Sequence, residues 1–253
     1  MTFVQFLPHL IKGSKWLIPK LFEAEREKRG PGFLKKLKLL YASKITFSDK
    51  HLRVSIAYLF RIKIDDKYLL IKGRRIDQYQ PVGGVYKYYS EDVRDFFNKL
   101  DVRDDKLMPI DDHSRDDLRL RVPGKHLIEF LNWFTSEQGR ETDQQREFQE
   151  ELVEPGFLSV AFNKITSRYL YTVWRPLTYS PYSEATELMV YQVYELRLTN
   201  PQEAELKTLQ QQNIKELRWV TEDQIKRLGD DQLAHPNPFR IGQHACYLLS
   251  PAG

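Results

Sequence analysis

The run Arg146–Leu152, which reads Arg-Glu-Phe-Gln-Glu-Glu-Leu, constrains the fold of this chain more than any other stretch. In an α-helix, with 100° between successive residues, Glu147, Glu150 and Glu151 share one face, and the two apolar residues of the run lie on a neighbouring face. Like charges at this spacing repel one another and destabilise an isolated helix. The run therefore predicts a helix anchored in a core, with a partner of opposite charge on its acidic face.

A divalent cation is the partner that the three carboxylates favour, because Mg²⁺ takes oxygen ligands and commonly bridges carboxylates to a substrate phosphate. We expect Mg²⁺, with Mn²⁺ as its substitute, and Glu147, Glu150 and Glu151 as its ligands. The alternative interpretation is a solvated acidic helix face that ends at Pro155 and Gly156.

Composition predicts a globular protein with one large core. The chain has 253 residues, of which 41% are hydrophobic and 29% charged. The net charge of +4 is too small to indicate nucleic-acid binding, and we expect no duplex nucleic acid as a partner. The single Cys246 excludes an internal disulfide and fits a reducing compartment, so a cytoplasmic location is expected.

Residues 1–46 are expected to form a helical extension to a domain at 47–253. The apolar part, Phe3 to Phe22, is interrupted by prolines and lysines, so we expect neither a transmembrane span nor a signal peptide. Two roles are open for this segment, which either lies on a membrane surface or packs on protein. If the protein is a sensor, we expect the segment to mediate a homo-oligomer or to dock on a partner.

The remaining pattern predicts an α+β sandwich, in which strands flank one Glu-rich helix. The sequence predicts a hairpin over 54–72, with its turn at 65–67. Further strands are expected at 159–162, 169–175 and 187–198, while 79–85 leads into a Gly-Gly turn and 217–221 precedes a closing helix. Helices are expected at 91–100, 125–134, 144–153, 222–228 and 241–249.

The run Arg146–Leu152 resembles the second half of a Nudix box. Upstream, Gly139–Thr142 resembles the Gly-Glu-Thr that opens the catalytic helix of that family, and Gln80–Val85 resembles its Pro-Gly-Gly turn. Longer phrases resemble the SMODS-associated Nudix domains, which sit in bacterial antiphage loci of the CBASS type beside enzymes that make cyclic nucleotides. These phrases lie at 52–62, 80–87, 116–123 and 140–152.

The resemblance covers about 47–249. It implies a Nudix-type α/β/α sandwich with a long insertion at about 86–134 and an N-terminal helical extension. It also implies that Glu147, Glu150 and Glu151 hold the metal and that Glu147 or Glu151 positions or deprotonates the attacking water. Arg146 would hold one of these carboxylates in place through a bidentate pair.

The expected substrate contacts come from glycines and basic residues. Gly83 and Gly84 suit a backbone that closely approaches a ligand. Lys72 and Arg74 precede that turn and could meet phosphates. Arg119 and Arg121 alternate, so they share a face if their segment is extended, where they meet either a charged ligand or an internal ion pair.

Two functions remain open on the sequence alone. The first is a Mg²⁺-dependent hydrolase that cleaves a phosphoanhydride in a nucleotide or a nucleoside diphosphate derivative. The second is a non-hydrolytic sensor of antiphage defence, which binds a cyclic oligonucleotide and acts through oligomerisation or a partner. Fold alone does not choose between them.

Overall fold

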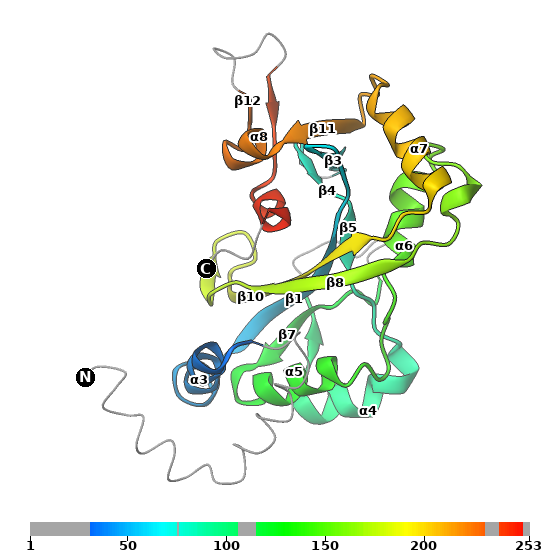
Figure 1. Ribbon diagram of the computed structural model, residues 1–253. Coiled ribbons are helices and arrows are strands. Elements are labelled where there is room, and N and C mark those ends of the chain that lie inside the picture. Colours follow the sequence, from blue (N-terminus) through cyan, green and yellow to red (C-terminus); the bar gives the residue numbers. More distant parts are fainter. Residues whose placement is uncertain (1–30, 75, 106–114, 231–237, 250–253) are drawn as a thin grey trace.

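The computed structural model describes residues 31–74, 76–105, 115–230 and 238–249 (Figure 1). The segment Phe3 to Phe22, with its expected role in self-association, lies outside the described residues. The described end of the N-terminal extension is helical, as expected. There, α3 (Phe33–Tyr41) continues directly into the π-helical turn η1 (Ala42–Thr46).

The centre of the fold is β1 (His51–Arg61), in which every residue except the two at its ends is buried. A strand covered on both faces reads as a near-continuous apolar run, as this one does. It pairs in parallel with β10 (Ala185–Leu196) and antiparallel with β5 (Gly83–Val85) and β7 (Arg119–Pro123). Three more strands complete a seven-stranded mixed sheet: β6 (Arg103–Asp104), β8 (Ser167–Trp174) and β9 (Thr178–Ser180).

A smaller, four-stranded sheet is built on β3 (Lys67–Lys72). This strand pairs with β2 (Lys63–Ile64), β4 (Tyr79–Pro81) and β11 (Leu217–Thr221). The expected turn is confirmed, and the expected hairpin is confirmed next to it, where β2 pairs with β3; the rest of the first strand, 54–61, belongs to β1 of the main sheet. Beside this sheet lies a short ribbon of two strands, β12 (Gly229–Asp230) and β13 (Phe239–Arg240).

The stretch expected as an insertion contributes both helices and strands. Its helices α4 (Ser90–Leu100) and α5 (Leu127–Thr135) confirm the two helices predicted there, and α5 follows a 3₁₀ turn, η2 (Gly124–His126). Because β6 and β7 join the main sheet, this stretch extends the sheet rather than forming a separate unit. Figure 1 shows α4 and α5 together near β7, at the end of the molecule opposite β3, β4 and β11.

Two 3₁₀ turns in the second half of the chain differ from what the sequence predicts. The strand expected at 159–162 is a 3₁₀ turn, η4 (Val160–Phe162), in which the Ser159 hydroxyl accepts a hydrogen bond from the Ala161 amide. The helix expected at 241–249 is present, but as a 3₁₀ helix, η5 (Gln243–Leu248). Short apolar runs do not separate these conformations by periodicity.

Two more helices complete the fold. α7 (Asn200–Gln210) was not predicted, and α8 (Glu222–Lys226) was. Helices together with mixed sheets confirm the α+β class. Within the described ranges, no helix is both long and apolar enough to cross a membrane.

Candidate active site

The acidic run forms a short α-helix, α6 (Gln145–Phe148), that continues as a π-helical turn, η3 (Gln149–Val153). Phe148 and Leu152 are fully buried, and the Phe148 ring packs edge-on against that of Phe60 on β1. Burial of one such side chain contributes about 1.5–3 kcal/mol. The core contact therefore holds the helix in place, as the sequence predicted, and turns its acidic residues towards β5.

Arg146 lies at the centre of the carboxylates. Its Nε is 3.1 Å from Glu141 Oε1, and its Nη1 is 2.8 Å from Glu147 Oε1 and 3.5 Å from Glu150 Oε1. Its Nη2 donates to the Val85 carbonyl across 2.9 Å. Although burial opposes its charge, Glu147 and Glu141 hold the pKa of Arg146 above its ordinary value. Arg146 therefore holds the carboxylates of Glu141, Glu147 and Glu150 in position through ion pairs.

The two glycines of β5 let the helix approach closely. The Gly83 amide donates to Glu151 Oε2 across 2.9 Å. Gly83 has a φ of 142°, and a Cβ there would lie 2.2 Å from the Tyr58 carbonyl oxygen. A Cβ on Gly84 would lie 2.1 Å from the carboxylate carbon of Glu147. Gly84 thus leaves the space that the Glu147 carboxylate needs, whereas Gly83 is required by the close approach of the Tyr58 backbone.

Burial changes the acid strength of two carboxyl groups in this region. Burial raises the pKa of Glu151 to about 8; the Gly83 hydrogen bond opposes the shift and the nearby Glu147 adds to it. Burial also raises the pKa of Asp117 to about 7, against the influence of Arg119. Two carboxyl groups at this site therefore titrate near neutral pH.

Sequence reasoning missed three residues of this site. Glu141 accepts hydrogen bonds from Arg146 and from the Lys87 amide, the latter across 3.2 Å. The Tyr58 hydroxyl accepts one from the Glu147 amide across 3.4 Å. Asp117 comes from the inserted stretch. Only the Gly-Glu-Thr-like segment containing Glu141 carried a signal in the sequence, since the other two reach the helix through tertiary packing.

The structure separates the residues predicted to bind substrate. Gly83 and Gly84 contact the acidic helix, and Arg74 lies 3.5 Å from the Glu150 carbonyl oxygen. Lys72 instead forms an ion pair with Asp77 across 2.9 Å.

The two arginines of β7 lie in ion pairs. Arg119 is 3.5 Å from Asp117. Arg121 is 3.0 Å from Asp105 and donates to the Ser183 carbonyl across 2.7 Å. Of the two predicted roles, these contacts favour the internal ion pair for Arg121. Its contact with a substrate stays a prediction.

The donor chemistry fits a hard cation in part. Within the described ranges, no three acidic, histidine or cysteine side chains are grouped so as to hold a metal ion. Glu147 and Glu151 nevertheless lie together against β5, and Mg²⁺ often uses only one or two carboxylates, with water and substrate oxygens completing its shell. A cation would have to share Glu147 with Arg146.

Comparison with known proteins places this geometry in a family. A family model described as the SMODS-associated NUDIX domain matches residues 51–249. Comparisons with curated proteins and with solved structures gave no match. The matched stretch begins with β1 and contains both sheets, the inserted stretch and the acidic helix. Nudix domains usually use divalent metals. Since the match covers well over half of its residues, this chain belongs to the SMODS-associated NUDIX domain family, with the α+β Nudix-type fold.

Proposed function

We propose that this protein hydrolyses a phosphoanhydride bond in a nucleotide or a nucleoside diphosphate derivative, with Mg²⁺ or Mn²⁺ at the acidic helix. The observation that carries the proposal is the environment of the Glu151 carboxyl group. This group is buried, is held through one oxygen by the Gly83 amide, and has a pKa raised to about 8. A group that titrates near neutral pH is suited to accept a proton from an attacking water.

The neighbouring residues would bind the cation and hold the carboxylates in position. Glu147, Glu150 and Glu151 would hold the cation, which neutralises phosphate charge and acidifies a bound water. Arg146 fixes Glu147 and Glu141 through ion pairs of 2.8 and 3.1 Å, so that Glu147 does not rotate away from β5. Glu151 is the group that we assign to the proton, because its position is set by the backbone rather than by another mobile side chain.

The test is cleavage of a panel of nucleotides and nucleoside diphosphate derivatives with Mg²⁺ present, followed by chromatography of the two phosphate-containing products that hydrolysis of the anhydride yields. Glu151→Gln keeps the shape of the side chain and removes the proton acceptor, and it should lower the rate by roughly 10²–10⁴-fold. Glu154→Gln is the matched control, since Glu154 follows the same helix and is exposed. Absence of cleavage of every compound by the unsubstituted protein would refute the proposal.

A second function, sensing without turnover, is favoured by the arrangement around Arg146. Three carboxylates share its guanidinium, so the chain supplies a large part of their charge balance itself. A Nudix-type module of antiphage defence would then bind a cyclic oligonucleotide and act through oligomerisation or a partner. A ligand that raises the melting temperature of the full chain and is recovered intact would support sensing.

A further inference from the structure

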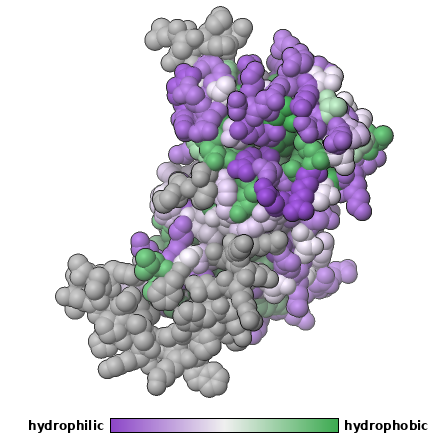
Figure 2. Space-filling view, viewed as in Figure 1, coloured by the Kyte–Doolittle hydropathy of each residue, from purple (hydrophilic) through white to green (hydrophobic). Residues whose placement is uncertain are grey.

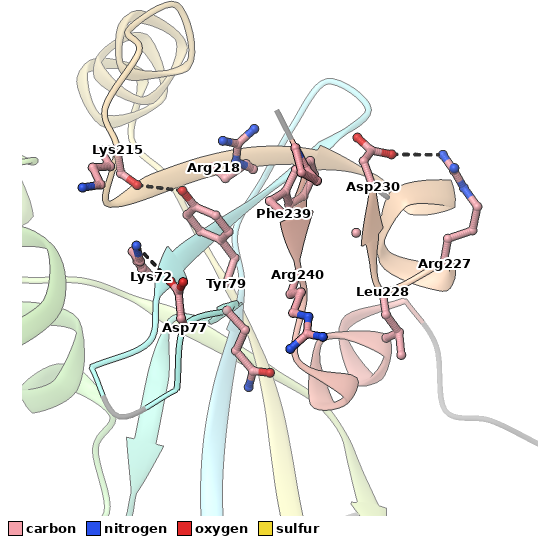
Figure 3. A pocket seen from close by; sticks show the side chains of 13 residues that line it. Lys72, Asp77, Tyr79, Lys215, Arg218, Arg227, Leu228, Asp230, Phe239 and Arg240 are labelled. Carbon is pink, nitrogen blue, oxygen red and sulfur yellow. Dashed lines mark hydrogen bonds and ion pairs between the residues drawn. The ribbon is translucent and has the colours of Figure 1, made fainter. Parts of the chain in front are cut away.

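A basic pocket of about 910 Å³ lies away from the acidic helix. Its walls come from the end of β3, the segment before β4, β11, and the β12–β13 ribbon (Figure 3). None of its lining residues belongs to α6, η3 or β5. The space-filling view shows mainly hydrophilic residues over the neighbouring α7, β11 and α8 (Figure 2). This pocket is therefore separate from the site described above.

The lining carries an excess of positive charge. Two acidic side chains, Asp77 and Asp230, face five basic ones. The basic side chains are Lys72, Lys215, Arg218, Arg227 and Arg240. Lys72 pairs with Asp77, and Arg227 pairs with Asp230 across 3.5 Å. The remaining three cations exceed the acids available to them, so the pocket attracts anions.

Two of the three remaining cations are exposed, and the third has a donor without a partner among the described residues. Lys215 and Arg240 are exposed, and neither forms an ion pair with a described residue. The guanidinium of Arg218 lies over the rings of Tyr79 and Phe239, 5.0 and 4.2 Å from their centroids. Its Nε is buried and has no hydrogen-bond partner among the described residues. A buried donor without an acceptor is unfavourable, and an anionic oxygen would satisfy it.

The pocket also has an apolar wall. Leu228 is 39% exposed and Phe239 is half-buried, and both line the pocket. Tyr79 packs edge-on against Phe239, and its hydroxyl donates to the Lys215 carbonyl across 2.7 Å, which ties β4 to the segment before β11. Cations beside an apolar wall match a small molecule that carries phosphate groups on a less polar body.

We propose that this pocket is a second ligand site, which binds the phosphate chain of a small molecule through Lys215, Arg218 and Arg240. A nucleoside polyphosphate and an inorganic polyphosphate share this chemistry. The proposal goes beyond the hydrolase assignment, since it requires neither a metal nor bond cleavage. Each of the two proposals can therefore fail while the other stands.

Calorimetry on the full chain in EDTA tests the site, with ADP, pyrophosphate and adenosine as probes. Saturable binding of ADP or pyrophosphate, with adenosine at least tenfold weaker, is the expected result. Tighter binding of ADP than of pyrophosphate assigns the site to nucleotides, and equal binding assigns it to the phosphate chain alone. No saturable binding of either anion, or binding of adenosine as tight as that of ADP, overturns the proposal.

Paired variants locate the binding. Lys215→Gln with Arg240→Gln removes two exposed charges from the pocket. This double substitution should weaken the binding of ADP and of pyrophosphate at least tenfold. Lys207→Gln with Arg168→Gln removes the same two residue types from exposed positions outside the pocket and should change affinity less than twofold. Equal effects of the two pairs, or no effect of the pocket pair, would assign the binding to general surface charge and refute the site.

Discussion

The backbone amide of Gly83 donates to the carboxylate of Glu151 across 2.9 Å, although the two residues are 68 positions apart in the chain. The inserted stretch, with α4, β7 and α5, lies between them. This hydrogen bond fixes the depth at which the acidic helix sits on β5. It also explains how a long insertion is accommodated, because the stretch leaves and re-enters the site at two positions that the main sheet and the core hold together.

Gly84→Ala should destabilise the protein by about 1–3 kcal/mol, because the added methyl group overlaps the Glu147 carboxylate. The same substitution in a Glu147→Ala background should cost less, since the overlapping group is then missing. Urea denaturation of the four proteins of this double-mutant cycle measures the difference. Gly32→Ala is the control, because a Cβ there meets no atom within 4 Å. Equal losses in both backgrounds would show that the methyl group clashes elsewhere.

Mg²⁺ should raise the melting temperature of the parent protein, because a cation that binds the folded state alone stabilises it, by about 2.7 kcal/mol at 100 times its dissociation constant. Glu150→Gln with Glu151→Gln should melt higher than the parent in EDTA, through relief of repulsion and of carboxylate burial, and should no longer respond to Mg²⁺. Glu154→Gln should respond like the parent. A parent protein that is indifferent to Mg²⁺ and Mn²⁺ would remove the metal from the site.

The pKa of Asp117, raised from 3.8 to about 7 by burial, makes stability depend on pH. Between these values the folded state binds more protons than the unfolded state, so the free energy of unfolding falls as the pH rises from about 4 to about 7. Asp117→Asn removes this fall. As the pH rises through that window, the free energy of unfolding of the variant should increase relative to that of the parent by up to roughly 1.4 kcal/mol per pH unit. Urea melts at several pH values measure the gain, and the exposed Asp66→Asn serves as the control. Parallel profiles for Asp117→Asn and the parent would contradict the shift.

Arg121→Gln should lower stability by about 2–3 kcal/mol, because Arg121 is paired with Asp105, whose side chain is 1% exposed. The loss stays below that of a fully broken buried pair, since Arg53 also contacts Asp105. Arg119→Gln, at a more exposed pair, should cost less. Urea denaturation measures both losses. If Arg121→Gln instead leaves stability unchanged and weakens nucleotide binding, Arg121 contacts the ligand rather than stabilising the fold.

The sequence predicted the parts of the fold that carry a clear local pattern. Two apolar runs, 54–64 and 68–72, flank the polar turn at 65–67, and the acidic helix carries its own core contacts in Phe148 and Leu152. Helix α7 was missed although Thr199 and Gln202 form a capping box with Pro201 in the first turn, which is a readable start signal. The 3₁₀ turn at 160–162 differs from the predicted strand because three residues carry too little periodicity to separate the two conformations.

The predictable part of the candidate site was the acidic run, together with Gly83 and Gly84 through the resemblance of their turn to the Nudix pattern. Arg146, Glu147, Glu150 and Glu151 stand in one run, so their proximity follows from helix geometry. Asp117 reaches the site from the inserted stretch, through the pairing of the segment before β7, and no local pattern reports that contact. The basic pocket was missed for the same reason, since its cations come from four segments that only the tertiary fold brings together.

The π-helical turn at Gln149–Val153 makes the length of the acidic segment as important as its composition. A π-turn holds one more residue than an α-turn, and such turns often occur at functional sites. Loss of a single residue before Glu151 would rotate its side chain by about 100° around the helix axis, away from Gly83. Insertions and deletions within this segment are therefore expected to be excluded far more strictly than conservative substitutions.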